Sequence, residues 1–391
     1  MNELEKLREE INQIDKQLTE LFEKRMNTVL KVAQYKKENN IPILNKNREE
    51  QVINRNNSYL ENKDFETATA EFFKDVMSIS RRLQAKNLYE FNYEENNNSN
   101  LEYELYKKLY SLPKKDNVKV GFQGVNGSFS EQALQKYFGD KVSTYNVAEF
   151  EDVFKALQNS EIDYGILPIE NSSTGGISEI YDFLRKYGFF IVGETCVEVN
   201  HNLLGVKGAK CEDIMEVYSH PQAFEQSKEF LHQYSQWKLI PHYNTAISAK
   251  YVKDKACKSM GAIGSKKAAE LYDLEIIESD INYNTNNYTR FIIIGKNLEF
   301  QENHNKISIT LSLPHKAGEL YNILSVFAEN NLSMLKIESR PILNKPWEYF
   351  FYIDFKGNLS EKGVKEAIKL INNNSHEFKL LGNYKAYLIE E

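Results

Sequence analysis

Two parts of this 391-residue sequence place polar side chains at spacings that could do chemistry. In the first, NNYTRFIIIG (residues 286–295), a polar stretch meets an apolar run, and Thr289 and Arg290 stand at the join. Side chains at strand ends lie at the rim of the clefts in which α/β proteins bind ligands. A hydroxyl there can donate or relay a proton, and the neighbouring Arg can hold a carboxylate. A structural alternative stays open, because Thr is a good strand residue and Arg290 could cap a sheet edge.

The second part is N-terminal, where Arg25 and Lys36 share one face of a predicted helix. Val29 and Val32 lie between them at steps of four, three and four. A charge on a packed face is costly unless it is paired, although a lone Arg can reach past its neighbours to water. Further polar residues converge on the same predicted helices, namely Arg8, Arg48, Glu49, Ser80 and Gln84. This mostly cationic set predicts a pocket for a small polyanion.

Three further polar strand ends accompany Thr289 in the middle of the chain. They are GVNGSFS (124–130), PIENSSTGG (168–176) and YSHPQAFEQ (218–226). In the first, Ser128 and Glu131 are spaced as a capping box, and such a turn favours an anion before its helix, although a plain tight turn is the simpler interpretation. Each stretch alone is explained by turn chemistry. Together, and without a His/Cys cluster of metal-binding type, they predict a cleft lined by hydroxyls and amides that binds an anion.

The elements that must position these residues fall into successive segments. Residues 1–90 have almost no glycine and predict three helices. The first is long and ends at Pro42, and two shorter helices follow, of which the earlier one has Asn45 as its N-cap. The apolar positions of the first helix alternate in steps of three and four, as in a packed seam: Leu4, Leu7, Ile11, Ile14, Leu18 and Leu21. The third helix has its own apolar positions: Phe65, Phe72, Val76, Ile79 and Leu83. Three such helices leave part of the seam uncovered, so the segment is expected to dimerise.

The rest of the sequence has a different periodicity. Residues 91–116 are Asn-rich and charged and predict a linker. Residues 117–297 alternate short apolar strands (VKVGF, YGILPI, FFIVGE, IMEVYS, MGAIG and RFIIIG) with helical stretches, which predicts an α/β domain. Residues 305–391 predict strand, helix, two strands, helix and a last strand at YKAYLI, a ferredoxin-like βαββαβ order of the α+β class.

Composition narrows the class of protein. Lys and Arg total 49 against 56 Asp and Glu, so the net charge of −7 offers no basic face for nucleic acid. The N-terminus lacks the apolar region of a signal peptide, and no window reaches membrane-spanning length. Cys196, Cys211 and Cys257 have neither the count nor the spacing of a disulfide framework or a zinc site. We expect a cytoplasmic protein that needs no metal or cofactor and binds neither nucleic acid nor membrane.

The N-terminal pattern of LREEI, EKR, YKK, Asn-x-x-Arg-Glu and IS-x-x-x-Q resembles the all-helical chorismate mutases over roughly the first ninety residues. The resemblance implies that Arg25, with Arg8 of the partner subunit, clamps the two carboxylates of chorismate. It further implies that Lys36 and Gln84 donate to the ether oxygen, that Glu49 accepts from the hydroxyl, and that Arg48 and Ser80 occupy other pocket positions. A Claisen rearrangement needs only the reactive conformer and stabilisation of charge on the ether oxygen.

The four central stretches together resemble prephenate dehydratase, whose two-lobed fold is similar to type 2 periplasmic binding proteins. The resemblance implies that Thr289 assists departure of the ring hydroxyl as water while the ring carboxylate is lost. It leaves open whether Thr289 is the acid itself or positions it. The implied substrate-binding residues are Asn171, Ser173, Ser219, Gln226 and Arg290.

AGELYNIL and IESRPI resemble the phenylalanine-binding motifs of the ACT regulatory domain. The implied effector-binding residues are Gly318, Glu319, Leu320, Glu338, Ser339, Arg340 and Pro341. Glu319 departs from the small residue usual at its position. The predicted core residues of this segment are Leu311, Leu320, Ile323, Leu324 and Val326.

These resemblances predict a bifunctional homodimer or homotetramer that converts chorismate to prephenate and then to phenylpyruvate, under feedback control by L-phenylalanine. A rival hypothesis from another class is a non-catalytic sensor, with a two-lobed binding domain, a dimerising helical arm and an effector domain. Thr289 together with Arg25, Lys36 and Gln84 favours the enzyme, because a sensor has no use for that combination.

Overall fold

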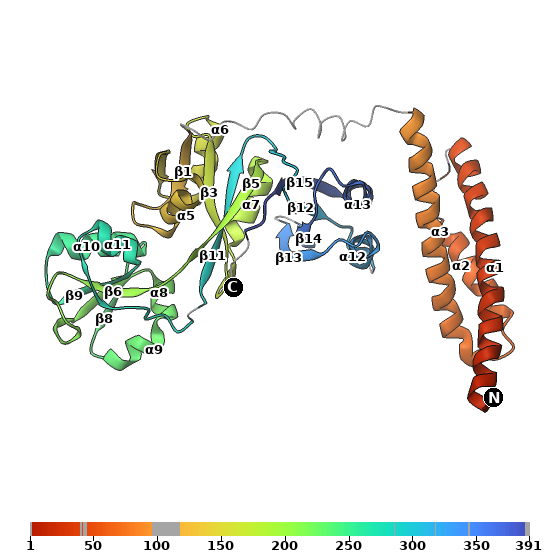
Figure 1. Cartoon of the computed structure of the whole chain (residues 1–391), viewed down its shortest axis with the longest axis horizontal. Coiled ribbons are helices and arrows are strands. Elements are labelled where there is room, and N and C mark those ends of the chain that lie inside the picture. The colour runs from red at the N-terminus through yellow and green to blue at the C-terminus, as the bar shows by residue number, and fades with distance from the viewer. Residues whose placement is uncertain are drawn as a thin grey trace. The chain divides into compact units, whose positions relative to one another are not determined.

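The computed structural model describes residues 2–39, 41, 45–95, 118–284, 286–316, 318–342 and 345–387. The chain divides into two compact units, Met1–Glu104 and Leu105–Glu391, and each is described by itself. Figure 1 shows the first as a set of helices and the second as a mixture of strands and helices.

The first unit contains α1 (Glu3–Glu38), α2 (Lys46–Ser58), a short 3₁₀ turn (Lys63–Phe65) and α3 (Glu66–Glu95). α1 and α3 run side by side in Figure 1. Asn45 caps α2 as predicted, because its side chain accepts a hydrogen bond from the backbone N–H of Arg48. The expected helix end at Pro42 lies outside the described residues.

The third helix is longer than the sequence suggested. α3 has 30 residues and runs to Glu95, so the helix continues into the stretch from residue 91 that the sequence predicts as a linker, and the domain bounds stay a prediction. Residues 85–95 contain neither glycine nor proline, so nothing local ends the helix where composition turns polar. The rest of the predicted linker, from 96 to 116, lies outside the described residues.

The apolar seam of α1 is uncovered within this chain. Its residues are between 48% and 61% exposed: Leu4, Leu7, Ile11, Ile14, Leu18 and Leu21. The buried apolar side chains lie farther along the helices instead, at Met26, Ala33, Val76 and Met77. Among the described residues of this unit, the three helices therefore leave one long apolar face uncovered.

The second unit begins with a sheet ordered β2-β1-β3-β11-β5, with the short β4 paired to β3. We call this sheet and its helices the first lobe. Its strands are β1 (Lys119–Gln123), β2 (Ser143–Val147), β3 (Tyr164–Asn171), β4 (Gly175–Gly176), β5 (Phe190–Glu198) and β11 (Tyr288–Gly295), and its helices are α5 (Phe129–Phe138), α6 (Phe150–Gln158) and α7 (Ser178–Tyr187). β3 and β11 read as continuous apolar runs because both faces of this sheet are covered.

The second lobe is an insertion between β5 and β11. Its sheet is ordered β10-β6-β9-β7-β8. The strands are β6 (Asn202–Gly205), β7 (Glu216–Ser219), β8 (Lys238–Pro241), β9 (Met260–Gly264) and β10 (Glu275–Glu278), and the helices are α8 (Pro221–Gln226), α9 (Lys228–Leu231), α10 (Thr245–Lys255) and α11 (Lys266–Leu271), with 3₁₀ turns at Cys211–Asp213 and His232–Tyr234. The chain therefore passes between the lobes twice, and Figure 1 shows these two passages.

The C-terminal sheet is antiparallel and ordered β13-β14-β12-β15. Its elements are β12 (Lys306–Ser312), α12 (Glu319–Glu329), β13 (Met334–Ile342), β14 (Lys345–Lys356), α13 (Lys362–Asn373) and β15 (Glu377–Tyr384). The predicted βαββαβ order is confirmed, but the last strand precedes the predicted YKAYLI. Lys379, Gly382 and Asn383 are weak strand formers, yet the strand holds because Asn383 is fully buried and donates to the carbonyl of Lys306.

The C-terminal sheet and the first lobe share a hydrophobic core. Ile180, Tyr181 and Leu184 of α7 pack in one cluster with Tyr352 and Tyr384 of the C-terminal sheet. A second core lies under α12 and α13, and it includes Leu311, Ile323 and Val326 as predicted. Leu320 is a correction: it is 36% exposed, because the first turn of α12 lies at the edge of this core.

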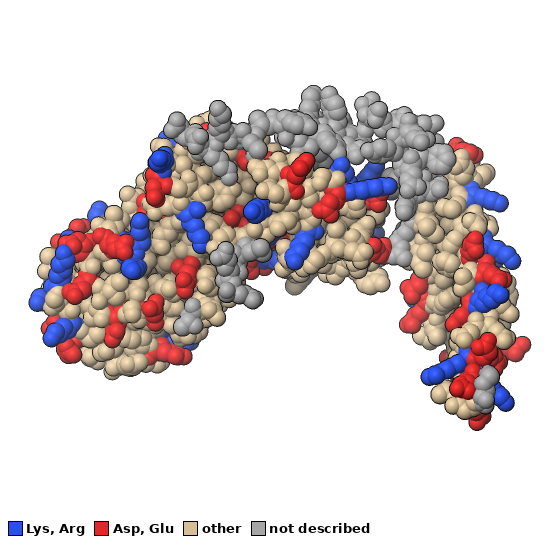
Figure 2. Space-filling model, in the orientation of Figure 1, with Lys and Arg blue, Asp and Glu red and all other residues tan. Residues whose placement is uncertain are grey.

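Charged residues are distributed without a dominant sign. On the face shown in Figure 2, Lys and Arg side chains are interspersed with Asp and Glu. Within the part of the chain that the structure describes, no helix has both the length and the apolar composition needed to cross a bilayer.

Candidate active sites

The meeting of β3 and β11 brings two predicted polar strand ends together. Thr289 pairs in register with Asn171, and Arg290 pairs with Glu170. The register shifts next to these pairs, because Phe291 lies opposite Pro168 and Ile169 is an extra residue on β3. Pro168 has no N–H to give to the ladder, and prolines inside sheets occur at such bulges.

The bulge decides which side chains share a face. Ile166 and Leu167 of β3 alternate normally between the core under α5 and the core under α7. With one extra residue, Ile169 and Glu170 both face the α7 side, and Asn171 returns to the face of Thr289 and Phe291. Without the bulge, simple alternation would place Glu170 rather than Asn171 beside Thr289.

The side chain of Asn171 orients the hydroxyl of Thr289. The Nδ2 atom of Asn171 donates to Thr289 Oγ1 at 2.9 Å, and both residues are buried. Among the described residues, no group accepts the proton of that hydroxyl. Because the amide occupies a lone pair of the oxygen, the Thr289 O–H is left to donate to another partner.

The orientation of the Asn171 amide is itself determined by its neighbours. Its Oδ1 accepts from the backbone N–H groups of Ser173, at 3.0 Å, and Thr174, at 3.2 Å. Backbone donors therefore hold the oxygen, and Nδ2 must point to Thr289 and to Asn287 Oδ1, at 2.8 Å. The Ser173 hydroxyl also donates to Asn287 Oδ1, at 3.3 Å. Asn287 is 1% exposed, and its Nδ2 has no partner among the described residues, so it is an available donor in this cluster.

Two other predicted binding residues are buried beneath the second lobe's surface. The Ser219 hydroxyl is fully buried and donates to the carbonyl of Ile263, so the predicted substrate contact of Ser219 is not available to it; it joins β7 to β9 instead. Gln226 Oε1 lies 2.7 Å from Nε2 of the buried His201. Burial lowers the pKa of His201, against the opposing effect of this hydrogen bond.

Hydrogen bonds also join the second lobe to the first around this cluster. Gln222 Nε2 donates to Thr174 Oγ1 at 2.9 Å. On the other side, Tyr272 donates to the carbonyl of Asn126 in the glycine-spaced turn. In that turn the backbone N–H of Gly127 already has a partner, because it donates a hydrogen bond to the Glu131 carboxylate at 2.6 Å. The structure therefore supports the plain tight turn rather than an anion site there.

Arg290 does not face this cluster, which corrects the prediction that it holds a substrate carboxylate. Successive residues of a strand point to opposite faces, so Arg290 points away from Thr289. Its guanidinium contacts Glu170 at 2.8 Å, Glu194 at 3.1 Å and Asp354 at 2.9 Å. With three carboxylates around it, Arg290 has no free charge for a substrate.

The helical unit brings three of its predicted site residues onto one buried face. Arg25 Nη1 donates to Ser80 Oγ at 2.5 Å, between α1 and α3. Ser80 and Gln84 are one turn apart on α3 and both are buried, and Gln84 Oε1 has no partner among the described residues. Burial lowers the pKa of Arg25, although an arginine stays protonated at neutral pH.

The other predicted residues of this unit have different environments. Glu49 is held by an ion pair with Arg81, the residue after Ser80, which sequence reasoning did not single out. Arg8 and Arg48 are exposed, and Lys36 is half-buried near the end of α1. Arg8 precedes Arg25 by 17 residues, or about 25 Å along a helix, so it cannot reach the pocket of its own chain.

Comparison with known proteins connects both sites to one family. Residues 7–85 match the model of chorismate mutase type II, and residues 120–299 match the model of prephenate dehydratase. The chain is 33% identical over 392 residues to the bifunctional chorismate mutase/prephenate dehydratase of Buchnera aphidicola subsp. Acyrthosiphon pisum, with 98% of this chain and 96% of the relative covered.

The chain belongs to the bifunctional chorismate mutase/prephenate dehydratases. Its activities are those of an isomerase and a carbon–oxygen lyase of aromatic amino acid biosynthesis, which sets the sensor hypothesis aside. The prephenate dehydratase of Methanocaldococcus jannaschii is 35% identical, over 71% of this chain and 98% of that protein. A prephenate dehydratase structure from Arthrobacter aurescens, in complex with L-Phe, is 26% identical with a TM-score of 0.63, over 69% of this chain and 90% of that one.

The implied effector residues of this bifunctional chain divide between two faces of the C-terminal sheet. Glu319 and Leu320 line a hollow of about 140 Å³ with four residues of β14, namely Trp347, Glu348, Tyr349 and Phe351. On β13, Ser339 and Pro341 are exposed, whereas Glu338 and Arg340 face the dehydratase. Arg340 bonds there to Asp182 of α7 at 2.9 Å. Glu338 and Arg340 therefore contact the first lobe rather than the hollow. The seven residues predicted to bind the effector do not all lie around one pocket of this chain.

Three residues around these sites escaped sequence reasoning. Asn287 lies within NNYTRFIIIG, but nothing in its type marks it as a partner of Asn171. Arg81 follows Ser80 and could have been found as a cation opposite Glu49. Trp347 lines the hollow with a positive φ of 68°, which a bulky residue rarely adopts, and no sequence signal marks it.

Proposed function

We propose that the helical unit rearranges chorismate by holding it in its reactive conformer. Arg25, positioned by Ser80, binds a substrate carboxylate. Lys36 and Gln84 stabilise the charge that develops on the breaking ether oxygen. Glu49, held by Arg81, accepts a hydrogen bond from the substrate hydroxyl. Arg48 borders the pocket. The ether C–O bond breaks as a C–C bond forms within the substrate, with no proton transfer and no covalent bond to the enzyme, so the rate follows from positioning and electrostatics.

The mutase pocket is proposed to be completed by a second copy of the chain. Arg8 lies about 25 Å from Arg25 along α1, so it serves the pocket of the partner subunit. The uncovered seam from Leu4 to Leu21 lies on the same helix and buries its apolar side chains when two copies pair. A homodimer, or a tetramer of such dimers, supplies both features.

For the dehydratase, we propose that the Thr289 hydroxyl protonates the departing ring hydroxyl of prephenate. The C–O bond breaks as the ring carboxylate leaves as carbon dioxide, and the electron pair of the C–C bond completes the aromatic ring. The products are phenylpyruvate, carbon dioxide and water, and solvent restores the threonine proton. Asn171 orients the hydroxyl, Asn287 offers its Nδ2 donor to the substrate, and Ser173, whose hydroxyl donates to Asn287 Oδ1, borders the substrate beside it. Gln226, through His201, supports the second lobe beside them.

The C-terminal sheet is proposed to be an ACT domain that binds L-phenylalanine. Its βαββαβ order, the hollow beside Glu319 and Leu320, and the L-Phe complex of the Arthrobacter relative support this. Gly318 has a φ of 86° at the N-cap of α12, which directs the loop toward the hollow. The exposed Ser339 and Pro341 lie on the neighbouring strand. A cytoplasmic location remains a prediction from the sequence.

The hydrogen bond from Asn171 to Thr289 is the observation on which the dehydratase proposal depends. The test is steady-state turnover of chorismate by the purified chain, with chorismate loss and phenylpyruvate formation measured separately. Chorismate should be consumed and phenylpyruvate should accumulate, and prephenate alone should also be converted. A chain that binds prephenate without forming phenylpyruvate would refute the assignment of the central site.

A further inference from the structure

Six charged side chains form one buried cluster between the first lobe and the C-terminal sheet. We call it the junction cluster: Glu170 of β3, Glu194 of β5, Arg290 of β11, Lys306 of β12, Lys336 of β13 and Asp354 of β14. Besides the three contacts of Arg290, Lys306 lies 2.8 Å from Glu194 and 3.3 Å from Asp354. Lys336 lies 3.0 Å from Glu170. Three cations thus face these three carboxylates, and Glu338 of β13 adds a fourth carboxylate 3.9 Å from Lys336.

Most side chains of this cluster are buried, so the loss of any one contact is expected to destabilise the protein. The side chains of Glu194 and Lys306 are 3% and 6% exposed, those of Lys336, Arg290 and Asp354 do not exceed 16%, and that of Glu170, at the edge of the cluster, is 34% exposed. Burial alone would raise the pKa of Glu170, yet Arg290 and Lys336 hold it below its ordinary value. Loss of one partner leaves the others buried with an unmatched charge.

The cluster touches the immediate neighbours of both residues in the proposed catalytic pair. Glu170 precedes Asn171, and Arg290 follows Thr289, in two adjacent register pairs of β3 and β11. The bulge at Pro168 directs one pair to the cleft and the other to the C-terminal sheet. A displacement of Glu170 and Arg290 must therefore move the backbone that holds Asn171 and Thr289.

We infer that the Lys336–Glu170–Arg290 chain of ion pairs positions the catalytic pair and transmits the state of the C-terminal sheet to it. Lys336 is the cation of β13 in this chain, and it is a positioning residue because it contacts Glu170 and not the cleft. The inference deepens the proposed dehydratase function and rests on the role proposed there for Thr289.

The strand that bears Lys336 also connects it to the proposed effector face. Lys336 lies three residues before Ser339 on β13, and Ser339 pairs in register with Phe351, which lines the hollow. β13 is the edge strand of its sheet, so it has one strand neighbour, β14, and can shift more readily than a central strand. A ligand that moves β13 changes the contact between Lys336 and Glu170.

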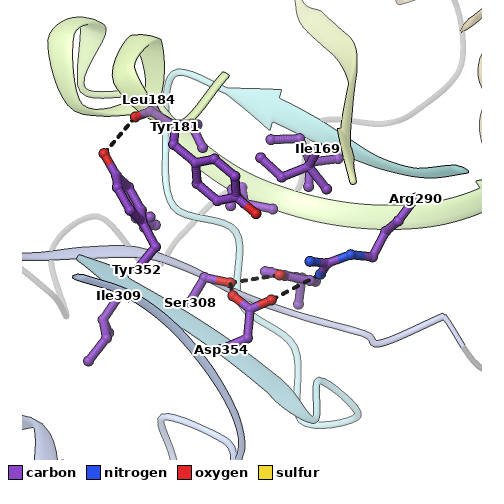
Figure 3. A pocket seen from close by; sticks show the side chains of 12 residues that line it. Ile169, Tyr181, Leu184, Arg290, Ser308, Ile309, Tyr352 and Asp354 are labelled. Atoms are coloured by element: carbon purple, nitrogen blue, oxygen red, sulfur yellow. Dashed lines mark hydrogen bonds and ion pairs between the residues drawn. The ribbon is translucent and has the colours of Figure 1, made fainter. Parts of the chain in front are cut away.

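The junction itself leaves no room for an effector. A cavity beside the cluster has a volume of about 10 Å³, room for about one water molecule. Figure 3 shows Arg290 and Asp354 directed toward each other in it, with Ser308 beside Asp354. At the junction cluster, the C-terminal sheet therefore acts on β3 and β11 through direct side-chain contacts and not through a bound ligand.

The test is Lys336→Met, which removes the charge and keeps most of the length. Dehydratase kcat should fall roughly 3- to 30-fold, as for a coupling residue, while KM for prephenate changes less. Inhibition by L-phenylalanine should weaken, and Lys336→Arg should restore both properties. Mutase kcat, measured on the same samples, should be unchanged, because that pocket belongs to the separate helical unit, and it reports the amount of chain in each sample. Lys345→Met is the matched control, because Lys345 is an exposed lysine on neighbouring β14 whose nearest acid is Glu348 at 3.7 Å.

A double-mutant cycle with Glu170→Gln separates positioning from general destabilisation. If Lys336 acts through Glu170, Lys336→Met should add less than about twofold in the Glu170→Gln background. Multiplicative losses, or a Lys336→Met enzyme with normal kcat and normal phenylalanine inhibition, would overturn the inference. Thr289→Ala, assayed in parallel, keeps the two proposals apart: if it stays active, the catalytic role of Thr289 is wrong whatever Lys336→Met does.

Discussion

Asn171 and Thr289 lie 118 residues apart in the sequence, yet the amide nitrogen of the first is 2.9 Å from the hydroxyl oxygen of the second. The amide can only donate through that nitrogen, so the threonine proton must go elsewhere. Two backbone N–H groups in turn prevent the amide from rotating. The pair is therefore preorganised as a hydroxyl donor rather than as a passive polar contact.

The first prediction concerns this hydroxyl. Thr289→Ala should lower dehydratase kcat by about 10²- to 10⁴-fold, the range for a general acid, and should leave mutase kcat intact because that pocket belongs to a separate compact unit. Thr289→Ser, which keeps the hydroxyl, should retain more activity. Separate assays with chorismate and prephenate measure both. Equal activity of the alanine and serine variants would show that the hydroxyl is not the working group.

The second prediction concerns the mutase. Lys36→Ala should lose about 10²-fold or more in mutase kcat, as expected when one donor to a developing oxyanion is removed, with dehydratase turnover of prephenate unchanged. Because Gln84 does not titrate, wild-type mutase kcat should vary little between mildly acidic and neutral pH. A pH–rate profile checks this. Near-normal mutase kinetics in Lys36→Ala would reject the assignment.

The third prediction tests the shared pocket. Arg8→Ala and Lys36→Ala homodimers should both have weak mutase activity. Unfolding and refolding an equal mixture should restore about a quarter of the wild-type activity, because each mixed dimer has one pocket with both residues intact. Lys345→Met refolded with Lys36→Ala is the control for recovery on refolding, because about half of its pockets are intact whether or not chains exchange. If the Arg8→Ala and Lys36→Ala mixture stays inactive although dimers have exchanged, Arg8 does not serve the partner's pocket.

The fourth prediction uses the tryptophans of the chain. It has two, the buried Trp237 of the second lobe and Trp347, which is 75% exposed at the hollow. In a Trp237→Phe background, L-phenylalanine should change the emission of Trp347, because the ligand enters the hollow that Trp347 lines. Gly318→Val should weaken the response, since a φ of 86° is unfavourable for a β-branched residue. Calorimetric binding unchanged by Gly318→Val would move the effector site away from this loop.

The fifth prediction follows from the acids of the junction cluster. Burial opposes ionisation of Asp354, but Lys306 and Arg290 hold its pKa below the ordinary value of 3.8. A depressed folded pKa adds stability above the unfolded pKa, and this stability is lost as pH falls below about 4 through the folded pKa. Asp354→Asn should reduce the free energy of unfolding at neutral pH by about 3 kcal/mol, and the difference from wild type should narrow in acid. Thermal unfolding of both proteins from pH 7 to pH 3 measures it, and a constant difference would contradict the argument.

The sequence predicts elements well where local pattern and burial agree. The apolar runs that became β3, β9 and β11 are bounded by turn residues, and each formed a strand. The last strand was predicted a few residues too late, because β15 is stabilised by the buried Asn383, a tertiary feature that no local window contains. The end of α3 was missed for the opposite reason: composition suggested a linker, although the local sequence had no helix breaker.

The candidate site shows a similar division. The type and position of Thr289 and Asn171 were visible in the sequence, but their contact depends on register. Strand alternation already implied that Arg290 points away from Thr289, and that signal was available. The direction of the Glu170 side chain could not be inferred from the sequence. It depends on a β-bulge, and Pro168 is compatible with such a bulge but does not require one. Arg290 was thus assigned to a substrate, whereas it binds three carboxylates of its own chain.

The position of β11 between β3 and β5 limits how far the first lobe can fold while the chain is still being synthesised. Both neighbours of β11 are synthesised before residue 200, but β11 follows only after the whole inserted second lobe. Until then β3 and β5 present open edges to other nascent chains. Slow synthesis across residues 200–287 would lengthen that exposure, and a chain released before Gly295 would have the second lobe but no Thr289 strand to close the first.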